Sequence, residues 1–378
     1  MKFLQPLALL AILGLAACNA TFAVGLEPFS TSTATIVPAS PSSPAPSATF
    51  PPASTSTLLP SPSQTPSALG TFVPVAVQTP TGYIDDRSNP SQLIVSFYSA
   101  INRKEYLRAY NYWANPSSSL TSFSSFSAGY QDTTSVDLVF GPITADPGMS
   151  QTYYTVPVLL KSTLTTGVHK NFAACYIVHA VEPGVFSSPP VFPMSIDRGS
   201  AAPADLSASD ADVLSTACNG YPVGSFPVPV SSGTLNIDKN NFVDNRSGPE
   251  ETVSSLLNAL NKKQYVRAYS YFQDPTAFPG PYSSFAAGYA DTDVITALFG
   301  DAQTEGAAGS VYYKLPLGLI VTTTSASTQT FVGCYTLRLS EPTVQEAPPF
   351  QPMGITTAKF SQVDNNTDVK ALLPTACQ

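Results

Sequence analysis

The sequence predicts an α+β fold in two tandem copies, and three observations support this prediction. The chain repeats itself without a gap, so that Tyr83 matches Phe242 and every later match keeps the same offset. Within each copy, residues at helical spacing come first and runs rich in Val, Tyr, Phe and Thr follow, an order typical of α+β domains. Each copy also carries two cysteines at matching positions.

The repeat is clearest in two phrases. The segment YIDDRS at residues 83–88 matches FVDNRS at 242–247, and SSFSAGYQDT at 124–133 matches SSFAAGYADT at 283–292. A unit of this length is a whole domain rather than a solenoid repeat. We therefore expect a first domain at 81–219, an interdomain linker at 220–240 and a second domain at 241–378.

Each copy begins with signals for helices. Pro90 and Pro249 stand at expected first helical positions, and apolar residues recur behind them at helical spacing. A second helix should begin near Tyr106, and a third should cover 122–128, with Gly129 and Gly288 as C-terminal caps. Strands are expected at 136–140, 153–163, 171–181 and 191–196, pairing antiparallel as one sheet.

Four cysteines lie within the repeats and allow three pairings. Only the pairs Cys175–Cys218 and Cys334–Cys377 close each copy on itself, so we expect these two disulfides. There is no C-x-x-C motif, and the long spacing argues against a metal or catalytic role.

The N-terminus predicts export. Lys2 precedes an apolar run at 3–17, which is too short for a convincing membrane span and reads as a signal peptide. Leu15-Ala16-Ala17-Cys18 resembles the bacterial lipobox, which predicts a signal peptide at 1–18 and lipidation of Cys18; an ordinary signal peptide is the alternative. Residues 19–80, dominated by Pro, Ser and Thr from about residue 31, are expected to form a disordered linker.

The helical phrase AINRKEYLRAYNYW at 100–113, followed by the run of strands, resembles the nuclear-transport-factor-2-like superfamily. The resemblance implies a cone in which N-terminal helices pack into a curved antiparallel sheet. A cystatin-like or other helix-on-sheet fold is the alternative. Members of that superfamily include isomerases, dehydratases and cyclases as well as binding modules, so the fold alone does not select a function.

The candidate catalytic residues are shared by both copies. Tyr130 with Asp132 is echoed by Tyr289 with Asp291, and a carboxylate beside a phenol in a dry cone suits general-base chemistry. The simpler interpretation is an Asx-type turn into the next strand, with Arg87 or Arg108 paired to Asp132.

The candidate ligand contacts are cationic and aromatic. The candidate ligand-binding residues are Arg87, Arg246, Tyr110, Tyr269 and Trp113. The aromatic residues stand at i, i+3, i+4 spacing, which favours a helix face buried on the sheet over a pocket wall. The two histidines, His169 and His179, are replaced in the second copy by Thr328 and Arg338, so a duplicated histidine site is excluded and strand-surface positions are expected.

Composition limits the function further. The formal charge is −8 with 11% charged residues, and no basic stripe is present, so nucleic-acid binding is not expected. No cofactor or metal motif is found. We expect a lipid-anchored binding or interaction module at the cell envelope, with the membrane and an envelope polymer, small ligand or protein as partners. An isomerase or hydro-lyase using Asp132 or Asp291 and a pure structural spacer are the alternatives.

Overall fold

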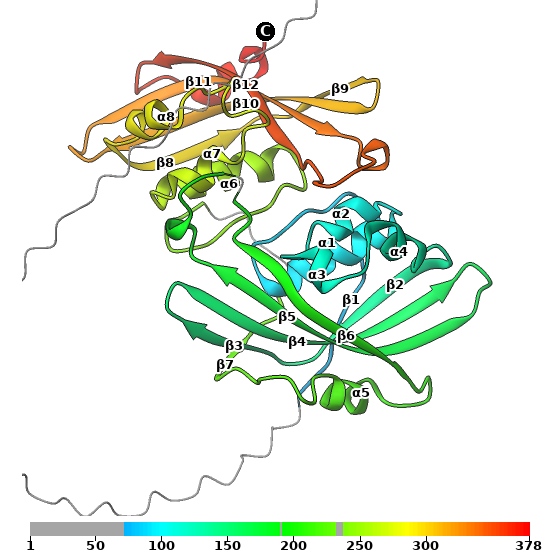
Figure 1. Ribbon diagram of the computed structural model, residues 1–378. Coiled ribbons are helices and arrows are strands. Elements are labelled where there is room, and N and C mark those ends of the chain that lie inside the picture. The colour runs from blue at the N-terminus through cyan, green and yellow to red at the C-terminus, as the bar shows by residue number, and fades with distance from the viewer. Residues whose placement is uncertain (1–71, 190, 232–236) are drawn as a thin grey trace, which may run out of the picture. The chain divides into compact units, whose positions relative to one another are not determined.

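The computed structural model describes residues 72–189, 191–231 and 237–378. Helices come first and antiparallel strands follow, twice along the chain, so the α+β prediction is confirmed at this level (Figure 1). The predicted signal peptide, Cys18 and most of the predicted linker at 19–80 lie outside the described residues.

The first repeat contains five α-helices and seven strands among its described residues. They are β1 (Val75–Val77), α1 (Pro90–Asn102), α2 (Tyr106–Tyr110), α3 (Pro116–Ser119), α4 (Phe123–Ala128), β2 (Thr133–Phe140), β3 (Ile143–Gly148), β4 (Gln151–Leu164), β5 (His169–Val181), β6 (Met194–Ala204), α5 (Asp210–Ala217) and β7 (Phe226–Val228). The long strand β4 is central: β5 pairs along one side of it, while β2 and β3 share the other side. All these pairs are antiparallel, and β6 continues the sheet beyond β5.

The second repeat has the same order. Its elements are α6 (Pro249–Asn261), α7 (Tyr265–Tyr269), α8 (Tyr282–Gly288), β8 (Thr292–Phe299), β9 (Gln303–Ala307), β10 (Ser310–Thr323), β11 (Thr328–Ser340), β12 (Gly354–Val363) and α9 (Val369–Leu372). Here β10 is central, with β11 on one side and β8 and β9 on the other. A separate antiparallel sheet therefore serves each repeat.

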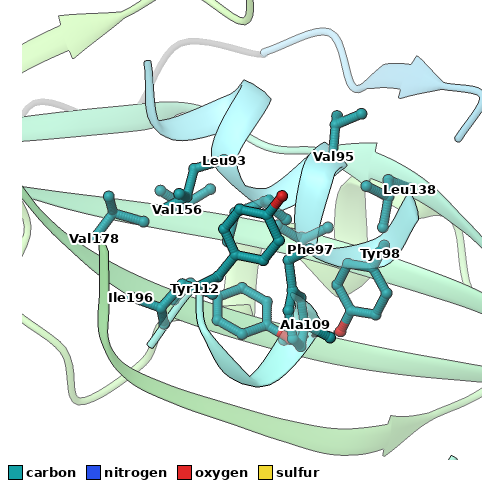
Figure 2. Close-up of a cluster of buried hydrophobic side chains, with 14 of the residues drawn as sticks. Leu93, Val95, Phe97, Tyr98, Ala109, Tyr112, Leu138, Val156, Val178 and Ile196 are labelled. Carbon is teal, nitrogen blue, oxygen red and sulfur yellow. Dashed lines mark hydrogen bonds between the residues drawn. The ribbon is translucent and has the colours of Figure 1, made fainter. Parts of the chain in front are cut away.

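The helix starts fall where the sequence predicts them. Pro90 opens α1, and the Asn89 side chain accepts a hydrogen bond from the Gln92 N–H at 3.0 Å, which satisfies one of the free amides of the first turn. The apolar face of α1 then packs on the sheet. Figure 2 shows Leu93 and Phe97 among strand residues, and both are fully buried.

Two short strands lie where the sequence analysis expects linkers. Val75–Val77 lies in the predicted linker at 19–80 but pairs with β2, and β7 lies in the predicted linker at 220–240 but pairs with β3. Both are edge strands of three residues, a length that carries no readable periodicity, and Pro227 fits an edge position. Of the two predicted glycine caps, Gly129 is the C-cap of α4, with a right-handed φ of −63°, whereas the prediction for Gly288 is wrong, because Gly288 lies inside α8 and Tyr289 caps that helix.

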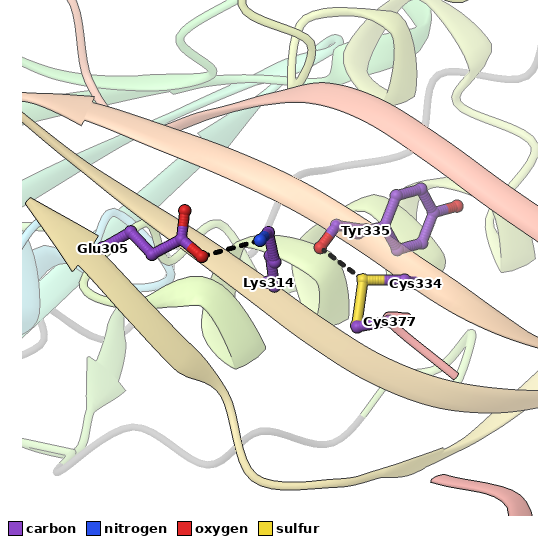
Figure 3. The surroundings of a disulfide bond; sticks show 5 residues. All are labelled: Glu305, Lys314, Cys334, Tyr335 and Cys377. Atoms are coloured by element: carbon purple, nitrogen blue, oxygen red, sulfur yellow. Dashed lines mark hydrogen bonds and ion pairs between the residues drawn. A yellow bond between two sulfur atoms is a disulfide. The ribbon is translucent and has the colours of Figure 1, made fainter. Parts of the chain in front are cut away.

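Both predicted disulfides are present. Cys175–Cys218 joins β5 to the end of α5, and Cys334–Cys377 joins β11 to the C-terminal turn (Figure 3). In each, 43 residues separate the cysteines and the Cα atoms lie 5.0 Å apart. The disulfides indicate an oxidising, extracytoplasmic environment.

The two repeats contact each other through their matching DDRS and DNRS segments, residues 85–88 and 244–247, which we call the clasp. The Arg87 N–H donates to the Asp244 carbonyl at 2.7 Å, and the Arg246 N–H donates to the Asp85 carbonyl at 2.6 Å. Two further bonds repeat this reciprocity, because the Asp85 and Asp244 amides donate to the serine hydroxyls of the opposite segment at 3.0 Å. The clasp is therefore a pseudo-twofold contact.

Candidate functional site

The segment around Asp132 forms the turn between α4 and β2. The Thr133 N–H donates to the Tyr130 carbonyl at 3.0 Å, and the Thr165 N–H donates to the Asp132 carbonyl at 2.8 Å. The turn is thus made by backbone bonds, and the Asp132 side chain is exposed. The second repeat builds the same turn, since the Thr324 N–H donates to the Asp291 carbonyl at 2.8 Å.

Tyr130 and Asp132 line one cavity of about 540 Å³ in the first repeat. The cavity lies between α1, α4 and the face of the sheet that these helices cover, and its apolar wall includes Phe126, Val136 and Leu160. A volume of this size is typical of small-molecule sites.

Two buried phenols add to the polar part of the lining, which also includes the hydroxyls of Ser125, Thr133 and Ser162. Tyr98 of α1 and Tyr176 of β5 are 2% and 5% exposed, and their hydroxyl oxygens lie 2.5 Å apart in a hydrogen bond. Burial raises the pKa of Tyr98 well above its usual value, and it raises the pKa of Tyr176 as well. Burial also raises the pKa of Tyr130 to about 12. The three phenols are therefore neutral at physiological pH.

Two charged side chains complete the lining. Asp132 and Lys170 are exposed, whereas Tyr98 and Tyr176 are buried, so the charges stand at the mouth and these two phenols lie deeper. The mouth therefore carries one negative and one positive side chain.

The second repeat carries bulkier or less polar residues at the corresponding positions. Leu257 replaces Tyr98, Val321 replaces Ser162 and Phe360 replaces Ala201. The ring of Phe360 packs against Tyr335, the counterpart of Tyr176, with centroids 5.0 Å apart. The contact of Tyr289 with Phe285, at 5.2 Å, is in contrast the same as that of Tyr130 with Phe126. The two repeats thus share a fold but differ in this interior.

The arginines predicted to contact a ligand lie elsewhere. Arg87 and Arg246 are 4% and 6% exposed, and each sits in the clasp with the carboxylate two residues before it, at 3.7 and 3.9 Å. The Arg87 guanidinium also stacks over Tyr112 at 4.5 Å. The expected pairing of Arg87 or Arg108 with Asp132 is wrong, because Arg108 bonds to Glu105 at 2.7 Å.

The predicted aromatic contacts are core residues that do not line the cavity. Tyr110 and Tyr269 are 6% and 4% exposed, and their hydroxyls donate to the Thr121 and Gly280 carbonyls at 3.2 and 2.6 Å. Trp113 is 7% exposed and packs edge-on against Phe97 and Tyr176.

The histidines lie on strand β5 as expected. His169 contacts the Thr163 hydroxyl at 3.1 Å, and His179 stacks on Tyr153 with ring centroids 4.4 Å apart. Within residues 72–189, 191–231 and 237–378, no three metal-ligating side chains gather. In the same residues, no helix has the length and apolar character needed to cross a membrane.

Comparisons with family models, curated proteins and solved structures find no match.

The cavity residues that the sequence did not single out are Tyr98 and Tyr176, together with the small residues Ser162 and Ala201. A comparison of the two copies could have pointed to three of these four residues. A gapless offset allows every position of one copy to be compared with the other, and Tyr98, Ser162 and Ala201 are places where the copies differ in size or polarity. Much of the lining, including Phe126, Tyr130 and Tyr176, is shared by the two copies, and the cavity of the first repeat is set apart by the few lining residues that differ.

Proposed function

We propose that the chain is an extracytoplasmic binding protein, tethered through Cys18, whose first repeat takes up a small and largely apolar molecule. The cavity of about 540 Å³ between the helices and sheet of that repeat carries the proposal. The lipobox-like segment and the Pro/Ser/Thr-rich linker support a lipid tether at Cys18. The two disulfides support an extracytoplasmic location. The second repeat then acts as a structural partner.

A probe and a matched pair of variants test this function. Naphthalene is neutral, rigid and small enough for the cavity, and its binding to the whole protein can be followed by calorimetry. Ala201→Phe introduces the aromatic residue of the second repeat at the rim of the cavity and should weaken binding by about tenfold or more. Ala202→Phe is the control, because successive side chains on β6 face opposite sides of the sheet and Ala202 lines a different hollow.

Two results would contradict the proposal. One is that wild-type protein does not bind naphthalene. The other is that Ala201→Phe and Ala202→Phe bind it as well as wild type, which would place the probe elsewhere.

An isomerase or hydro-lyase using Asp132 is the second candidate, because Asp132 and Tyr130 line the same cavity. A general base there should abstract a proton beside a bound carbonyl. The assay is deuterium exchange into the methyl group of 1-acetonaphthone in D₂O. The enzyme hypothesis predicts exchange that is faster with protein and lost in Asp132→Asn, whereas the binding hypothesis predicts the background rate with both.

A further inference from the structure

We propose that the Tyr98–Tyr176 pair is a hydrogen-bond donor site, which makes the ligand of the first repeat a neutral apolar molecule with one oxygen acceptor, such as a ketone. This inference rests on the proposed binding function and specifies the chemical class of the ligand. It is carried by the proton count of the two phenols and by their place in the cavity wall.

The pair has one proton more than its own hydrogen bond uses. Each neutral phenol has one O–H, and the single bond between Tyr98 and Tyr176 consumes one of the two protons. Among the described residues, neither hydroxyl makes another hydrogen bond to protein. One O–H therefore remains to donate, on side chains that are 2% and 5% exposed and line the cavity.

A buried donor without an acceptor costs free energy, and a ligand acceptor in the cavity would remove that cost. The phenol whose O–H is free is the one that accepts the hydrogen bond from the other phenol. Accepting that bond polarises its O–H and strengthens the bond that it donates to a ligand. The pair is specific to the first repeat, because Leu257 stands where Tyr98 would be needed in the second.

The rest of the cavity restricts the ligand to neutral molecules. The buried part of its lining combines apolar side chains with uncharged hydroxyls, and an ionised carboxylate would lose its hydration there without a cation beside it. Lys170 is exposed at the mouth, where Asp132 of opposite charge also stands. A carbonyl, ester or ether oxygen satisfies the free O–H without that loss.

Two probes of equal shape test the inference on the whole protein. In 1-acetonaphthone a carbonyl oxygen stands where 1-isopropenylnaphthalene has a CH₂ group, so the difference in their affinity isolates the acceptor. One hydrogen bond of ordinary net strength predicts that the ketone binds about three- to tenfold more tightly. The infrared stretching band of the bound ketone's carbonyl should also lie at lower frequency than that of the ketone in an apolar solvent, because a hydrogen bond to the oxygen weakens the C=O bond.

The double variant Tyr98→Phe, Tyr176→Phe should lose both the ketone preference and the band shift while it still binds the hydrocarbon. Either single variant keeps one phenol and should keep the preference. Tyr335→Phe, which removes the corresponding buried hydroxyl of the second repeat, is the control and should behave as wild type.

The outcomes separate the two proposals. If both probes bind and are blocked by Ala201→Phe, but the double variant keeps the ketone preference, the donor site is wrong and the binding function stands. Equal affinity of the two probes for wild-type protein would also overturn the donor site and leave the binding function standing. If neither probe binds, both proposals fail. If the double variant does not fold, the infrared measurement on wild-type protein remains as the test. A carbonyl band that does not shift when the ketone binds to wild-type protein would overturn the donor site.

Discussion

At the scale of single residues, the repeat provides an internal comparison for every buried polar group. Arg108 and Arg267 are counterparts and both are fully buried. Arg108 bonds to the Glu105 carboxylate at 2.7 Å, while Arg267 bonds to the Gln264 amide oxygen at 2.7 Å. The fold therefore accommodates this arginine with a charged or a neutral acceptor, provided that an acceptor is present.

Glu105→Ala should lower the free energy of unfolding by about 3–5 kcal/mol, because it leaves Arg108 buried without that acceptor. Glu105→Gln, which reproduces the second repeat, should cost clearly less. The measurement is urea unfolding of the whole protein. Glu305→Gln is the control for an exposed ion pair: Glu305 and Lys314 lie 2.6 Å apart on the surface (Figure 3), and we expect a change of at most about 1 kcal/mol. Equal losses for Glu105→Ala and Glu105→Gln would contradict this explanation.

At the scale of elements, β6 shows how one strand serves two faces of the sheet. Ala201 lines the cavity, whereas Ser200 and Ala202 line the hollow beside α5. On that outer face α5 buries Val213 and Leu214 against Val139 and Leu159, a second and smaller apolar cluster. The Cys175–Cys218 disulfide holds α5 there, so the covalent bond and the packing act on the same element.

Replacing both cysteines of this disulfide by serine should destabilise the protein by about 4 kcal/mol on the chain-entropy model for a 43-residue separation. The same change at Cys334 and Cys377 should have a similar effect, because the separation is equal. Unfolding in urea, compared between wild type and the two double variants, measures both. If only one of the two double variants loses stability, the packing of the segment that the disulfide holds, rather than loop closure, determines the stabilisation.

The elements also show how much of the fold can be predicted from the sequence. Pro90 and Pro249 mark helix starts because a proline at the first helical position loses no hydrogen bond, and the disulfides follow from symmetry between the copies. The strands β1 and β7 could not be predicted because three residues carry no period. The cavity could not be predicted because it depends on side-chain volume at Ala201 and Ser162, which only becomes meaningful once the fold brings β4, β5 and β6 together.

At the scale of the whole molecule, the clasp is the contact that relates the repeats. At its centre Asp86 is 4% exposed, pairs across an antiparallel bridge with Asn245, and accepts a hydrogen bond from the Asn245 amide at 3.3 Å. Burial raises the pKa of Asp86 from 3.8 to about 6, and the nearby Asp244 and Asp85 carboxylates add to the rise. Where a symmetric pair of repeats would have two equal residues, this clasp has one acid and one amide.

The raised pKa predicts the pH dependence of stability. Between pH 3.8 and about 6 the folded state holds a proton on Asp86 that the unfolded state has released. This contribution is fully present below pH 3.8 and is lost as the pH rises through about 6, so the free energy of unfolding should fall over that window. The measurement is urea unfolding at a series of pH values from below 3.8 to above about 6.

Asp86→Asn should flatten that part of the profile. Its stability at pH 7 should change little, because relief of the buried charge is offset by two amide groups that then face each other as donors. Asp205→Asn is the control, since Asp205 is exposed and lies outside the clasp. A profile for Asp86→Asn with the wild-type slope would show that Asp86 does not titrate in this window.

The first repeat, and not the second, is proposed to hold a small-molecule site, and a crystal structure of the protein soaked with 1-acetonaphthone would locate it. We expect one probe per chain between α1, α4 and the sheet of the first repeat, with its carbonyl oxygen within hydrogen-bond distance of the Tyr98 or Tyr176 hydroxyl. Probe density in the second repeat, or only on the outer surface, would contradict the proposal.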